Sequence, residues 1–220
     1  MKKSILFAAM LAAFTSSSVF AGGGSLFGGS SEEGAGTMYG GASIGKTSDG
    51  TCNSVKDEAG ALLGNIDCPT PSGWKVFGGY KVTPNLAVEG AYVDFGDGGS
   101  SGIIPVIAGV NNVANGASIS TQATGFNVSG VASTAATDEI SLFGKAGLMA
   151  WNKDTTATVQ QVGVKNATVT QESSTDGVDL SLGAGAEYKI NDNWGVRGEV
   201  EHFDGLNANL YSVGATFSTF

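Results

Sequence analysis

Hydrophobic and polar residues alternate along most of this chain with a period of two. The pattern is clearest over residues 177–190, where one face is apolar and the other carries Asp, Ser, Gly, Glu and Lys. The apolar face consists of Leu180, Leu182, Ala184, Ala186, Tyr188 and Ile190. Residues 193–203 repeat the pattern, with Trp194 and Val196 opposite Arg197. Because successive side chains of a β-strand point to opposite faces, this period predicts strands.

Eight strands are predicted in this way, and the fourth is the least periodic of them. They cover residues 37–46, 73–82, 85–95, 124–133, 139–151, 177–190, 193–203 and 208–220. Short turns are expected at 83–85, 134–138 and 191–193, and a short connection at 204–207. Long loops are expected at 47–72, 96–123 and 152–176. Short turns at one end and long loops at the other are typical of bacterial membrane barrels.

The N-terminus has the three regions of a secretory signal peptide. Lys2 and Lys3 supply the positive charge, Ile5–Phe14 is an apolar run too short to span a bilayer, and cleavage is expected after Ala21. Residues 22–36 are rich in Gly and Ser and are expected to form a flexible segment. One barrel domain is then expected over residues 37–220.

No stretch after residue 21 holds the ~20 apolar residues of a membrane helix. Only helices and closed barrels satisfy all backbone hydrogen bonds in lipid, so an exported chain of alternating strands favours a barrel. A soluble β-sandwich also alternates and is the competing fold. Five aromatics near strand ends are expected to lie at the two bilayer interfaces, with ordinary core packing as the alternative. They are Trp74, Tyr80, Tyr92, Tyr188 and Trp194.

Composition excludes some function classes. The formal net charge of −9 argues against nucleic-acid binding, which needs a basic surface. Cys52 and Cys68 are the only cysteines, and in an exported chain they are expected to form a disulfide within the first long loop. Two free thiols or a metal pair are the alternatives, and a metal site lacks nearby histidines. No pattern indicates a cofactor.

Several motifs together resemble the transmembrane domain of OmpA-like outer-membrane proteins. They lie at residues 39–45, 76–80, 86–96, 145–151, 185–188 and 197–199. The resemblance covers about residues 37–220 and implies an all-β, eight-stranded, antiparallel, up-and-down barrel in the outer membrane of a Gram-negative bacterium. It also implies a charged network inside the barrel, formed by Glu89, Lys145, Glu187, Arg197 and Glu199. There is no Lys or Arg between residues 82 and 144, so the basic partner that relatives carry on the fourth strand is missing.

A structural or surface-interaction role is the leading functional hypothesis, with the outer loops contacting a host or surface ligand. Other expected partners are outer-membrane lipids and the barrel-assembly machinery, which would bind the C-terminal strand. A narrow ion or small-solute channel and a small-ligand carrier are alternatives. A third is a lipid-modifying enzyme, but His202 is the only histidine and has no Ser near it in sequence. We expect no enzymatic activity.

Overall fold

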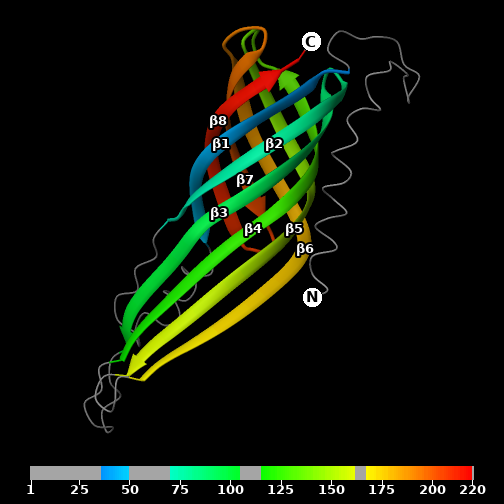
Figure 1. Ribbon diagram of the computed structural model, residues 1–220. Helices are drawn as coiled ribbons and strands as arrows, with labels where there is room; N and C mark the ends of the chain where they lie inside the picture. The colour runs from blue at the N-terminus through cyan, green and yellow to red at the C-terminus, as the bar shows by residue number, and fades with distance from the viewer. Residues whose placement is uncertain (1–35, 50–69, 105–114, 162–166, 220) are drawn as a thin grey trace. The chain divides into compact units, whose positions relative to one another are not determined.

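The computed structural model describes residues 36–49, 70–104, 115–161 and 167–219. Within these ranges the regular secondary structure consists of β-strands only. Eight strands follow one another around a closed barrel (Figure 1). Neighbouring strands are antiparallel, and β1 closes the barrel by pairing with both β2 and β8. The strands are β1 (Met38–Asp49), β2 (Ser72–Thr83), β3 (Leu86–Ile104), β4 (Asn115–Ala135), β5 (Ile140–Gln161), β6 (Ala167–Lys189), β7 (Trp194–Phe203) and β8 (Ala208–Ser218). The predicted eight-stranded, up-and-down barrel is confirmed.

The alternating pattern is inverted relative to a soluble protein. On β2 the apolar side chains of Trp74 and Val76 point outward and are 42% and 44% exposed, whereas Lys75 between them is fully buried in the lumen. On β6 Leu180 and Leu182 are likewise outside. A sandwich would bury the apolar face and expose the charges. This arrangement therefore suits a barrel with lipid outside and polar groups within.

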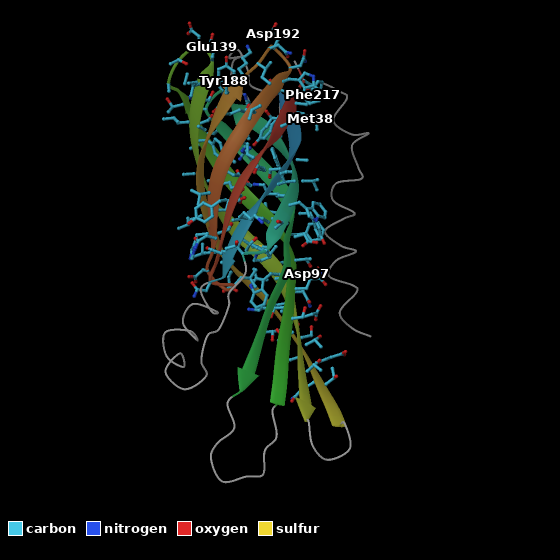
Figure 2. All side chains as sticks on the ribbon, turned by 90° about the vertical axis from the view of Figure 1, so that its left-hand side faces the viewer. Met38, Asp97, Glu139, Tyr188, Asp192 and Phe217 are labelled. Atoms are coloured by element: carbon cyan, nitrogen blue, oxygen red, sulfur yellow. The ribbon has the colours of Figure 1, made fainter. Side chains whose placement is uncertain are left out.

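One end of the barrel, which we call the turn end, carries three short connections closed by side-chain hydrogen bonds. Thr83 Oγ1 accepts the Leu86 N–H (3.0 Å), Thr137 Oγ1 accepts that of Ile140 (3.0 Å), and Asn191 Oδ1 accepts that of Trp194 (2.9 Å). Such Asx and Ser/Thr contacts stabilise tight turns. Figure 2 shows Glu139 and Asp192 at this end, with Met38 and Phe217 from the first and last strands nearby.

At the opposite end, the extension end, β3–β6 continue far beyond the other four strands (Figure 1). Pairing of β3 with β4 runs to Ile104, and pairing of β5 with β6 runs to Gln161. The predicted long loops at 96–123 and 152–176 are therefore wrong: most of these residues form strands, and residues 105–114 and 162–166 lie outside the described ranges. Their Ser, Thr and Gly content concealed them, because a sheet with two polar faces lacks the apolar alternation used to predict strands.

The projecting sheet separates from the barrel at a bulge in β3. Pairing of β2 with β3 ends at Trp74 and Asp94, and the β3–β4 register shifts between Asp94 and Asp97. Gly96 between them adopts φ +77°, and a Cβ there would lie 2.2 Å from the Ser72 carbonyl oxygen. Only glycine fits both the left-handed conformation and this close approach. Asp97, labelled in Figure 2, marks the level where β3–β6 continue alone.

An apolar cluster fills the lumen toward the extension end. Leu206, in the turn between β7 and β8, is 5% exposed and folds into this cluster. The rings of Phe95 and Phe203 meet edge-to-face at 5.0 Å. The buried members are Phe77, Ala91, Val93, Phe95, Ala123, Met149, Phe203, Leu206, Ala208 and Leu210. These side chains lie mainly on the extension-end side of the buried charged residues of the barrel.

Candidate functional site

Inside the barrel, Glu89 of β3 is the centre of a buried ionic network. Arg197 Nη1 lies 2.7 Å from Glu89 Oε2, and Arg197 Nη2 lies 3.4 Å from Oε1. Lys145 Nζ of β5 lies 3.4 Å from the same Oε1. The Tyr39 hydroxyl of β1 donates a hydrogen bond to Oε2 (3.0 Å). One carboxylate thus links strands β1, β3, β5 and β7 across the lumen.

Glu199 and Glu201 of β7 form the second half of the network. Lys75 of β2 binds both carboxylates, and Lys145 contacts both as well, lying 3.3 Å from Glu199 Oε2. Arg197 Nη2 lies 3.0 Å from Glu199 Oε2. The network contains three cations and three carboxylates, so its formal charge is zero. Buried charges are tolerated when each is paired in this way.

Two aromatic rings contact the guanidinium group of Arg197. The Arg197 Cζ atom lies 4.0 Å from the centroid of the Phe143 ring and 4.7 Å from that of Phe77. Cation–π contact is favourable within about 6 Å and is strongest where water is excluded. The rings and the two carboxylates together hold the guanidinium in one orientation. The network is therefore a packed cross-link between strands.

The structure brings together four of the five residues that the resemblance assigned to the interior: Glu89, Lys145, Arg197 and Glu199. Glu187 points into the lumen and pairs with Arg197 in the strand register, but within the described ranges it has no ion pair. Sequence reasoning missed Lys75 and Glu201. Both lie on the lumen-facing side of their strands, and this parity was the available signal.

The fourth strand has no basic residue, and β2 supplies the corresponding cation. Lys75 projects into the lumen and meets Glu199 and Glu201 from the opposite side to Lys145. The fourth strand contributes Asn127 instead, whose Oδ1 accepts a hydrogen bond from Ser181 Oγ (3.0 Å). A second set of cross-barrel ion pairs thus exists without a basic residue on β4.

On the outer surface, the aromatics expected at interfaces fall into two groups. Trp74 and Tyr92 lie toward the extension end with ring centroids 5.4 Å apart, and Tyr92 contacts Phe126 (5.0 Å). Toward the turn end, Trp194 contacts Phe217 (5.1 Å). Tyr80 and Tyr188, 44% and 49% exposed, also lie near the turn end.

His202 also points outward, near the extension end. Its Nδ1 lies 2.9 Å from Asn209 Oδ1, and Asn209 Nδ2 donates to Ser48 Oγ (3.3 Å). A hydrolase needs its serine bonded to the free imidazole nitrogen, with the orienting group on the other nitrogen. Here the serine lies beyond Asn209, so this arrangement does not activate Ser48 as a nucleophile.

Several predictions fall outside the described residues. Cys52 and Cys68, the signal peptide, residues 22–35 of the segment 22–36 and Phe220 belong to this group. The described part of the chain holds no cluster of three or more potential metal ligands of the His, Cys, Asp or Glu type. Nor does it contain a helix long and apolar enough to cross a membrane.

Comparison with solved structures finds other membrane barrels at low sequence identity. Ail of Yersinia pestis is 14% identical, with 84% of this chain and 99% of that chain covered and a TM-score of 0.44. OprG of Pseudomonas aeruginosa is 12% identical, with 84% and 96% covered and a TM-score of 0.48. The N-terminal barrel domain of OprF from the same species is 8% identical, with 85% and 100% covered and a TM-score of 0.45.

No curated protein sequence matches the chain significantly. The family model of the OmpA-like transmembrane domain, in contrast, matches residues 33–212. This range includes β1–β7, the first half of β8, the projecting sheet and all six charged residues of the interior network. The chain therefore belongs to the family of OmpA-like transmembrane domains, which are outer-membrane β-barrels.

Proposed function

We propose that this protein is a closed outer-membrane barrel that presents the projecting part of β3–β6 to the outside as a binding surface. The carrying observation is the length of these strands. Four of them continue together past the bulge at Gly96, while β2 begins at Ser72 and β7 ends at Phe203. The turn end, with its tight connections, would then face the periplasm after export and signal-peptide removal.

The surface of this sheet is polar and acidic. Four acidic side chains of the described part of this sheet are exposed: Asp97, Asp154, Glu172 and Asp176. Lys153 is the basic residue described there, and it is partly buried. Over residues 167–179, β6 pairs only with β5 within the described ranges, which leaves its outer edge available for main-chain hydrogen bonds. An acidic sheet with an open edge suits a basic extended segment of another protein, added as a further strand.

The barrel interior supports an interaction role more than a channel role. Ion pairs cross the lumen at Glu89, and the apolar cluster that includes Leu206 fills the lumen on their extension-end side. An eight-stranded barrel is narrow enough for side chains to fill its lumen. Ions would meet a salt-bridge layer and then an apolar layer, each of which opposes passage. The outward geometry of His202 gives no support to an enzymatic role.

Trimming the projecting sheet tests this function. Removing residues 100–119 and 156–172 takes out register-matched segments, because Ser100 pairs with Ile119 and Thr156 with Glu172. The wild-type protein in nanodiscs should bind an immobilised peptide of alternating Lys and Thr, and the trimmed barrel should not. Binding should weaken with added salt, since surface charges are screened within about 10 Å at 0.1 M.

A double substitution tests the acidic surface while leaving the strands intact. Glu172→Gln combined with Asp154→Asn removes two exposed acids from the sheet and should weaken binding to the Lys–Thr peptide. A Glu–Thr peptide should bind neither protein. Equal binding of the Lys–Thr peptide to the wild-type and trimmed barrels would contradict the proposal, as would equal binding of the two peptides.

A further inference from the structure

A polar row crosses the outward face at the extension end, and neither the interior network nor the projecting sheet uses it. It runs over three neighbouring strands, from His202 of β7 through Asn209 of β8 to Ser48 of β1. Both hydrogen bonds of the row, at 2.9 and 3.3 Å, are made by the Asn209 amide. These residues occupy positions that would face the bilayer or its headgroups.

Two residues closer to the barrel middle, at the next outward-facing position, a cation lies beside an aromatic ring. Lys46 pairs in the register with Tyr211 on one side and with Ser72 on the other, and its Nζ donates to Ser72 Oγ (2.9 Å). Tyr211 is 56% exposed. The next outward residues down these strands are apolar and exposed: Ile44, Trp74 and Val213. Lys and Tyr directly beside an apolar belt, on the side toward the end of the barrel, are typical of the headgroup level of a bilayer.

The hydrogen bonds define what each group offers to a ligand. Because Asn209 Oδ1 can only accept, its contact with His202 calls for a proton on Nδ1, and in the tautomer protonated there Nε2 is an acceptor for a hydroxyl group. Lys46 offers a charged donor suited to a phosphate. The strands of these two residues are separated by β8 alone, which places the two strands about 10 Å apart, and His202 lies two residues nearer the extension end than Lys46. The Tyr211 side chain projects from the intervening strand.

We propose that Lys46, Tyr211 and His202 bind the phosphorylated sugar headgroup of an outer-leaflet lipid. The phosphate would contact Lys46, a sugar hydroxyl would donate to His202 Nε2, and the sugar ring would lie on Tyr211. Among described residues, Lys46 is the outward-facing cation of the barrel wall at this end. Asp94 on the same face accepts the Gly96 N–H (2.8 Å), and Asp204 lies in the turn beyond His202.

Lipid binding by the full-length protein in detergent micelles tests this site without depending on orientation or on the projecting sheet. The probes are lipid A, a bisphosphorylated and acylated glucosamine disaccharide, and phosphatidic acid, which has a phosphate but neither a sugar ring nor a headgroup alcohol. Native mass spectrometry would measure both. The wild type should prefer lipid A, and Lys46→Gln should weaken its binding about tenfold, since a charge-assisted hydrogen bond is lost.

Two further variants separate the parts of the site. His202→Phe should weaken lipid A binding about fivefold, through loss of a neutral hydrogen bond, and leave phosphatidic acid binding unchanged. Lys189→Gln removes an exposed cation at the turn end, where Lys189 pairs with Asp192 (3.2 Å), and should change neither. Retention of the folded band on unboiled gels shows that each variant is a barrel.

Three results would overturn the proposal. The first is equal lipid A binding by the wild type and Lys46→Gln. The second is an equal loss in Lys189→Gln, which would indicate a general charge effect. The third is displacement of lipid A by millimolar inorganic phosphate, which would assign the site to the free anion.

Discussion

Arg197 of β7 and Glu89 of β3 bind each other across the lumen, at 2.7 Å between Nη1 and Oε2, although their strands are not neighbours in the barrel. Backbone pairing joins each strand only to the next one. This ion pair instead links opposite walls, and the rings of Phe77 and Phe143 keep its cation in place. It therefore resists distortion of the barrel cross-section in a way that the strand ladder does not.

Arg197→Ala should lower the free energy of unfolding by roughly 3–5 kcal/mol, because it leaves Glu89 and Glu199 with fewer cations in a buried site. Arg197→Lys should recover part of this, since it restores the charge but not the two-pronged contact. Urea titration of the protein refolded into lipid vesicles measures both variants. A neutral Arg197→Ala would contradict the assigned role of this pair.

Glu201 and Glu187 provide a matched comparison on neighbouring strands. Glu201 is 1% exposed and contacts Lys75 and Lys145, so Glu201→Gln should cost roughly 3 kcal/mol or more. Glu187→Gln removes a carboxylate that has no ion pair within the described ranges and should change stability by less than about 0.5 kcal/mol. The same urea titration measures both. Equal losses of stability in the two variants would contradict the assignment of Glu201, and not Glu187, to the ion-pair network.

Val196 lies next to Arg197 but points outward and is 39% exposed. Val196→Arg should destabilise the barrel by roughly 2–4 kcal/mol in vesicles, because it places a charge against the hydrocarbon. Ala136→Arg, at an exposed turn position, is the control and should change stability by less than about 0.5 kcal/mol. If Val196→Arg proves as harmless as the control, the inside–outside assignment of β7 fails.

Gly96 and Gly78 should respond differently to the same substitution. Gly96→Ala introduces a Cβ near the Ser72 carbonyl at a positive φ and should cost at least roughly 1–3 kcal/mol. At Gly78, which points outward, the added Cβ would meet its nearest atom at 3.8 Å, so Gly78→Ala should cost less than about 0.5 kcal/mol. Unfolding in vesicles distinguishes them. A harmless Gly96→Ala would mean that the bulge does not constrain the chain.

The disulfide between Cys52 and Cys68 remains a prediction, since both residues lie outside the described ranges. Alkylation of the unreduced protein under denaturing conditions should label neither cysteine, and alkylation after reduction should label both. Mass spectrometry counts the labels. Two labelled thiols without reductant would exclude the bond.

The barrel itself could be predicted because its cause is local. Alternation places Glu89, Arg197 and Glu199 on one face of their strands, and the apolar neighbours on the other, before any tertiary contact is known. The projecting sheet could not be predicted in this way, because its Ser, Thr and Gly residues do not alternate regularly with apolar ones. The residues between Asp97 and Gln122 then carry no hydrophobic period to read.

The sequence by itself determined which side of each barrel strand a residue occupies, and hence the barrel and the set of lumen-facing charges, while its motifs indicated the family. Tertiary structure alone decided which of those charges meet. Glu187 and Glu201 share the lumen-facing parity, yet only Glu201 lies between Lys75 and Lys145. Parity specifies the face but not the height in the barrel, and height depends on the register of all eight strands around the closed ring.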